Sequence, residues 1–162
     1  MKIGFFAFML IFFLSMLTYV CIRGGQALSS FGTLKGVFIA SSIVLFLMFF
    51  VGMILGNYFP LPVAKAITFL GNTFLVVMIY LTFAFFITDI TLIFNKIFHF
   101  ITNDTHTFRF WVLMVSSLVI FTVMAVGNYK FNHPQVVNLH ITTEKTSQQK
   151  EIKIVAISDV HL

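Results

Sequence analysis

Long apolar segments with almost no charge dominate the first 127 residues of the chain. Four of them stand out, at about residues 3–22, 36–57, 67–88 and 108–126. A helix needs roughly 20 consecutive apolar residues to cross the hydrocarbon core of a bilayer, and each segment has about that length. We therefore expect an all-α membrane domain of four transmembrane helices over residues 1–127, as part of a multi-pass integral protein of the cell membrane.

The composition of the chain supports a membrane protein and argues against a soluble domain and against a nucleic-acid-binding protein. The chain is 59% hydrophobic and 9% charged, with a mean hydropathy of +1.02, whereas a soluble domain is roughly 25% charged. The ten Lys and Arg residues are scattered singly at the ends of the apolar segments, where they can reach the membrane interface. We therefore expect the lipid bilayer as a partner and no nucleic acid, despite an isoelectric point of 9.6.

The first apolar segment is expected to remain as a helix, although a secretory signal peptide also begins with a basic residue and an apolar run. Residues 3–22 are longer than the apolar region of a signal peptide, and no cleavage site with small residues follows. Gly24 and Gly25 are typical of a helix end, so we expect a polar loop over residues 24–36. The single cysteine, Cys21, allows no disulfide within the chain.

Small residues four positions apart on the second segment predict close helix packing. The two pairs are Gly36 with Ala40 and Gly52 with Gly56. We favour packing inside the bundle over packing between two copies of the chain.

The third segment continues as a helical pattern beyond its apolar core. Its apolar residues share one face as far as Ile101, which predicts an amphipathic extension lying at the membrane interface. Asp89 at the start of this extension has two interpretations. It is either an intramembrane carboxylate with a function or a side chain at headgroup depth that caps or pairs locally, and we expect the second.

The fourth segment has signals at both ends. Residues 103–105 (Asn-Asp-Thr) are candidate N-cap residues, Arg109 and Trp111 are candidate interface anchors, and residues 127–129 (Gly-Asn-Tyr) are expected to end the helix. No charged residue lies at the centre of any segment, which disfavours a transporter or a channel.

Charge is unevenly distributed along the chain. Residues 1–127 contain eight charged side chains, and the much shorter stretch 128–162 contains seven. We therefore expect a linker over residues 128–134 and a second domain over residues 135–162. Four spans place both termini on one side of the membrane. Four basic residues lie near the membrane on each side, so the positive-inside rule does not decide the orientation. The N-terminal amine and the further Lys150 and Lys153 favour a cytoplasmic location for the second domain.

The last residues of the chain combine a predicted strand with two candidate metal ligands. Residues 152–157 are an apolar run rich in β-branched residues, and residues 137–142 alternate between apolar and polar, so both are predicted strands. Asp159 and His161 follow two positions apart, a spacing that places both side chains on one side of an extended backbone. Carboxylate and imidazole together suit Mn, Fe or Zn. Two ligands alone do not make a catalytic site, and a solvated polar turn remains the alternative.

The final ten residues resemble the first motif of the calcineurin-like metallophosphoesterases, in which a hydrophobic strand ends in Ser-Asp-x-His-Leu. The matching residues here are Ser158, Asp159, Val160, His161 and Leu162. The stretch from Gly127 to Pro134 also resembles the linker of membrane-anchored members.

The resemblance implies that residues 135–162 begin an α/β metallophosphoesterase sandwich, with Asp159 and His161 binding the first of two divalent metal ions. The later motifs of the family are absent, so we expect a chain truncated after its first Asp-x-His motif and inactive in this form.

Two functions follow from these patterns. The first is a membrane-anchored, metal-dependent phosphoesterase with a dinuclear site of Mn, Fe or Zn, acting on a lipid-linked phosphoester. The alternative is a non-enzymatic four-helix membrane anchor or interaction module.

Overall fold

The computed structural model describes residues 2–99 and 104–133, and this part of the chain is helical. The four long helices are α1 (Lys2–Ala27), α2 (Gly32–Leu55), α3 (Leu61–Phe98) and α4 (Thr105–Asn132), with a short 3-10 turn, η1 (Gly56–Tyr58), after α2. Each helix is long and apolar enough to span a membrane, so the predicted four-helix membrane domain is confirmed at this level. The two predicted strands, and the metal motif that follows the second, lie outside the described residues.

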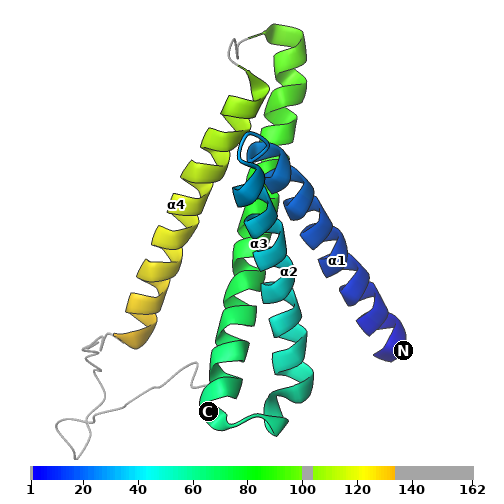
Figure 1. Ribbon diagram of the computed structural model, residues 1–162, viewed down its shortest axis with the longest axis vertical. Helices are drawn as coiled ribbons and strands as arrows, with labels where there is room; N and C mark the ends of the chain where they lie inside the picture. The colour runs from blue at the N-terminus through cyan, green and yellow to red at the C-terminus, as the bar shows by residue number, and fades with distance from the viewer. Residues whose placement is uncertain (1, 100–103, 134–162) are drawn as a thin grey trace, which may run out of the picture.

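The third helix is the centre of the bundle. It packs against α1, α2 and α4, while α1 also contacts α2 and α4. The helices converge at the end where α1 turns into α2, and α1 and α4 diverge from the bundle toward the opposite end (Figure 1). The start of α1 and the end of α4 both lie at this open end, as four antiparallel crossings require.

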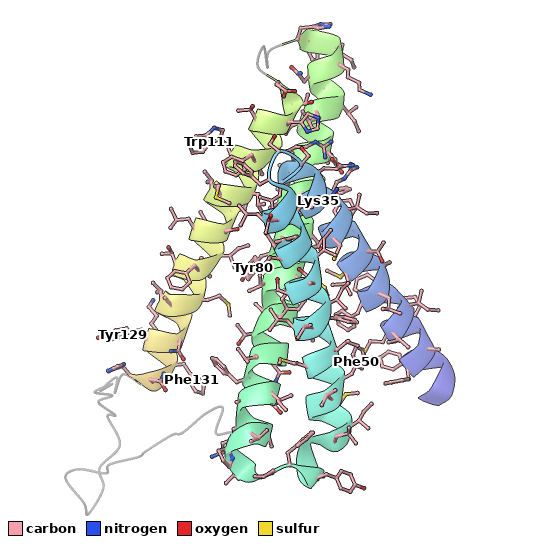
Figure 2. The ribbon with its side chains drawn as sticks, viewed as in Figure 1. Lys35, Phe50, Tyr80, Trp111, Tyr129 and Phe131 are labelled. Carbon is pink, nitrogen blue, oxygen red and sulfur yellow. The ribbon has the colours of Figure 1, made fainter. Side chains whose placement is uncertain are left out.

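Buried apolar side chains are concentrated where the helices converge. Val20 and Met78 are fully buried, and Phe46, Phe85 and Leu113 are nearly so. Residues 4–15 of α1 are exposed or half-buried, and so is α4 beyond residue 120. These exposed surfaces are apolar and are compatible with contact to lipid. Trp111 and Tyr129 project outward near the two ends of α4, where aromatic residues are typical of a membrane interface (Figure 2).

Two glycines allow α2 and α3 to approach closely at the open end. A Cβ atom on Gly71 would lie 2.5 Å from the Cα atom of Phe49, and one on Gly52 would lie 3.3 Å from the Cα atom of Thr68. Packing inside the bundle is therefore confirmed for Gly52. The same prediction is wrong for Gly36 and Gly56, because a Cβ atom on either residue would meet nothing within 4 Å.

Two helices, α1 and α4, continue past the glycines that were predicted to end them. The first helix continues through Gly24 and Gly25 to Ala27, so the expected loop over residues 24–36 is reduced to residues 28–31. The reason is tertiary packing, because the ring of Phe38 and the stem of Lys35 occupy the space beside these two glycines.

At the other end of the chain, α4 continues past the expected stop at residues 127–129. Its last turn is stabilised by side-chain contacts to the helix backbone. Asn132 Nδ2 donates to the carbonyl oxygen of Asn128 at 2.9 Å, and His133 Nδ1 lies 2.9 Å from that of Tyr129. Residues 128–132, expected to begin the linker, therefore complete the helix.

The predicted amphipathic extension is part of α3 itself. The helix runs without a break to Phe98, and His99 ends it in the left-handed conformation with a φ of 49°. Its last turns extend beyond the ends of α1 and α2 (Figure 1). The continuation of the helix past Asp89 is confirmed, and the position of these turns at the membrane interface stays a prediction.

Candidate functional site

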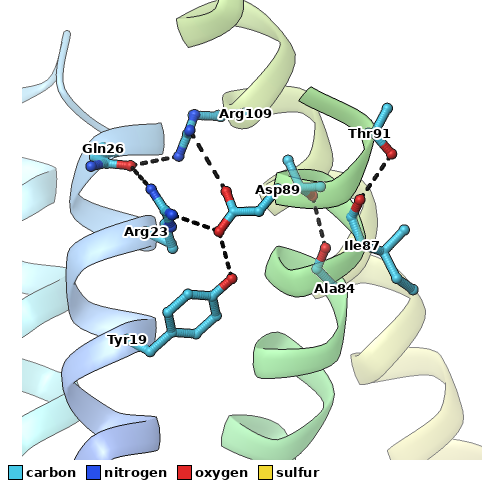
Figure 3. Close-up of polar contacts among 9 residues, drawn as sticks. Tyr19, Arg23, Gln26, Ala84, Ile87, Asp89, Thr91 and Arg109 are labelled. Atoms are coloured by element: carbon cyan, nitrogen blue, oxygen red, sulfur yellow. Dashed lines mark hydrogen bonds and ion pairs between the residues drawn. The ribbon is translucent and has the colours of Figure 1, made fainter. Parts of the chain in front are cut away.

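Asp89 is the centre of a polar cluster at the end where the helices converge. Its Oδ2 atom accepts a hydrogen bond from the Tyr19 hydroxyl at 2.7 Å and lies 2.6 Å from Nη2 of Arg23. Its Oδ1 atom lies 3.7 Å from Nη2 of Arg109, an ion pair longer than a hydrogen bond (Figure 3). One carboxylate on α3 therefore joins side chains from α1 and α4.

Gln26 completes the cluster by bridging the two arginines. Its Oε1 atom accepts from Nη1 of Arg23 at 2.9 Å and from Nη1 of Arg109 at 2.5 Å (Figure 3). The guanidinium of Arg23 also lies 5.6 Å from the centre of the Tyr19 ring, within the range of a cation–π contact. An amide oxygen between two cations lowers their mutual repulsion, so both can remain beside a single carboxylate.

The charged groups of the cluster are largely withdrawn from solvent. The side chains of Asp89, Arg109 and Arg23 are 18%, 21% and 29% exposed. Removing one partner from such a group leaves a charge without compensation, which costs more than an exposed ion pair contributes. The Nε atom of Arg23 is buried without a hydrogen-bond partner in the described part of the chain.

The sequence shows that Asp89, Arg23 and Arg109 lie at the ends of apolar segments, but it does not predict that they interact. The prediction that Asp89 caps or pairs locally is wrong, because its partners belong to α1 and α4. Arg23 and Arg109 were expected to reach the interface, yet both point toward Asp89. The available signal was a single acid beside one apolar segment with arginines at the matching ends of two others.

A second polar contact links the loop after α1 to the start of α4. Ser29 Oγ lies 3.0 Å from Nδ1 of His106. An N-cap within residues 103–105 is confirmed, and it is Asp104, whose side chain accepts from the backbone N–H of His106 at 3.3 Å. Ser29 and His106 also line an open groove of about 560 Å³, whose other lining residues belong to α1 and α2.

The geometry of the cluster favours clamping over catalysis. The Asp89 carboxylate is engaged by two cations and a hydroxyl, so it is poorly placed to act as a general base. Among the described residues, no group of three or more His, Cys, Asp or Glu side chains could hold a metal ion. Asp159 and His161, the predicted metal ligands, lie outside those residues.

No protein-family model, curated protein or solved structure matches the chain. The functional argument therefore depends on the sequence motif and on the geometry of the bundle.

Proposed function

We propose that residues 1–127 anchor a metal-dependent phosphoesterase domain that begins near residue 135 to a membrane. The observation that carries the proposal is the C-terminal motif, in which a predicted strand leads directly into Asp159 and His161. The arrangement of the bundle supports it. The fourth helix ends at Asn132, at the same end of the bundle as the start of α1, so the proposed domain follows the anchor within a few residues.

The two candidate ligands fit the expected metals in chemical type. An aspartate oxygen and a histidine nitrogen both coordinate Mn, Fe or Zn, and two such ions clamp a phosphate and lower the pKa of a bound water. In this proposal Asp159 and His161 hold one of the ions and do not transfer protons. Further ligands are needed, because catalytic metal sites commonly have three or more protein ligands.

The anchor constrains the substrate in this proposal. A catalytic domain joined closely to a spanning helix stays near the bilayer surface, where lipid-linked and lipid-headgroup phosphoesters are concentrated. We therefore propose a phosphoester of this kind as the substrate, with the domain on the cytoplasmic side. The alternative, a non-enzymatic anchor or interaction module, is favoured by the internal clamp at Asp89, which holds three helices together without the C-terminal residues.

The test compares two substitutions in the protein expressed as its gene encodes it, including any residues that follow Leu162. Asp159→Asn keeps the shape of the side chain and removes its charge, and Glu151→Gln is a matched control just before the predicted strand. We expect Mn²⁺-dependent hydrolysis of a phosphodiester in purified membranes for the parent and the control, and none for Asp159→Asn. All three proteins should insert into the membrane in equal amounts.

Two outcomes would overturn the proposal. Hydrolysis by Asp159→Asn at the parent rate would remove that residue from the metal site. Absence of metal-dependent hydrolysis in the parent, across lipid and soluble phosphoesters, would favour the non-enzymatic module.

A further inference from the structure

The groove between α1 and α2 is apolar at one end and polar at the other. Leu17 on α1 and Ile39 and Ile43 on α2 line its apolar part. Ser29 and the two basic side chains of the groove, Lys35 and His106, line it toward the end where the helices converge. Lys35 and Ile43 are eight residues apart on α2, which corresponds to about 12 Å along a helix.

The polar end of the groove carries an excess of positive charge. No Asp or Glu lines the groove, and both ion pairs of the described residues belong to Asp89, so neither involves Lys35. Lys35 is exposed, and its stem lies beside α1, because its Cε atom is 3.4 Å from where a Cβ atom on Gly25 would be. Lys35 thus lays its stem across α1 and keeps an ammonium group available for an anion.

His106 adds a hydrogen-bond donor at the same end. Its Nδ1 atom lies 3.0 Å from the Ser29 hydroxyl. When Nδ1 accepts that hydroxyl proton, Nε2 carries the ring proton and can donate to an anion. The groove therefore offers a cation and a neutral donor above an apolar channel.

We propose that this groove binds one anionic phospholipid. The phosphate lies at Lys35 and His106, and an acyl chain lies along Leu17, Ile39 and Ile43. Its volume of about 560 Å³ is within the range of small-molecule sites, roughly 300–1,000 Å³. A lysine ammonium group binds phosphate oxygens through charge-assisted hydrogen bonds, on either side of a membrane. The proposal depends on the described bundle alone and does not require the phosphoesterase.

The experiment measures lipid retention on the purified protein by native mass spectrometry. The protein is exchanged into mixed micelles with equal amounts of dioleoyl phosphatidylglycerol and dioleoyl phosphatidylcholine. We expect one retained phosphatidylglycerol per chain. Lys35→Gln should lower its retention about fivefold, the effect of one lysine beside an anionic lipid, and Lys35→Arg should restore it.

Lys96→Gln is the matched control. It removes the same charge from the last turn of α3, at the same end of the bundle but outside the groove, and should leave retention unchanged. An equal loss of retained phosphatidylglycerol in Lys35→Gln and Lys96→Gln would show only a general attraction between the basic protein and anionic lipid, and would overturn the proposal. Equal retention of the two lipids, or displacement of phosphatidylglycerol by glycerol phosphate at the same concentration, would overturn the anionic phospholipid as occupant.

Discussion

Gly71 is the position where a single methyl group should separate two helices. A Cβ atom there would lie 2.5 Å from both the Cα and the backbone N atoms of Phe49, and 3.0 Å from the carbonyl carbon of Met48. These are backbone atoms, so no side chain can rotate away from the new group. Because carbon atoms pack at about 3.5–4.0 Å, α2 and α3 would have to move apart by about 1 Å in Gly71→Ala.

The size of the effect follows from two opposing terms. Inserting a methyl group into a close-packed contact typically costs about 1–3 kcal/mol. Replacing glycine by alanine within a helix is favourable by about 1 kcal/mol. Gly36→Ala in α2 is the matched control, because a Cβ atom there would meet nothing within 4 Å and only the favourable term applies. The difference between the two variants should therefore be about 1–3 kcal/mol, with Gly71→Ala the less stable.

The assay uses the single cysteine of the chain. Cys21 on α1 is half-buried, and unfolding of the bundle exposes it to a thiol-reactive dye. The free energy of unfolding can be followed by its labelling as the fraction of denaturing detergent in mixed micelles is raised. If Gly71→Ala and Gly36→Ala differ by less than about 0.5 kcal/mol, the size of an ordinary surface change, the close approach of α2 and α3 is refuted.

The same assay tests the polar contacts. Asp89→Asn should destabilise the bundle by about 1.5–3 kcal/mol, the contribution of a hydrogen bond to a charged group, and its effect should not add to that of Arg23→Gln, since both remove one ion pair of 2.6 Å. Additive losses in this double-mutant cycle would argue against the pair. Asp104→Ala should cost about 0.5–2 kcal/mol by removing the N-cap of α4, and an unchanged stability would argue against the cap.

The number and rough position of the helices could be predicted from the sequence because membrane spans depend on length and hydrophobicity. Helix ends could not be predicted as well, because they depend on neighbours. Gly24 and Gly25 have the composition of a helix end, but side chains from α2 fill the space beside them. Asn128 and Asn132 bond to each other along α4, which extends that helix past Gly127.

The candidate site was predictable only in part, for a similar reason. The sequence shows that Asp89, Arg23 and Arg109 lie at the ends of apolar segments, but it does not show which faces of the helices meet. The close contact at Gly71 was missed because no second small residue lies four positions away to mark it. Pairing and close packing are properties of two helices together, whereas a periodic pattern describes one helix.

The proposed phospholipid site and the proposed phosphoesterase domain lie at opposite ends of the bundle. The groove lies where the helices converge, and α4 ends at Asn132 at the open end (Figure 1). Lys35, at the polar end of the groove, is 20 residues from the end of α2 at Leu55, which corresponds to about 30 Å along a helix. That distance is close to the hydrocarbon thickness of about 30 Å, so the proposed phosphate site lies near one membrane surface and the proposed catalytic domain near the other. A lipid bound in the groove would therefore support the anchor and would not be the substrate, which must reach the domain from the leaflet beside Asn132.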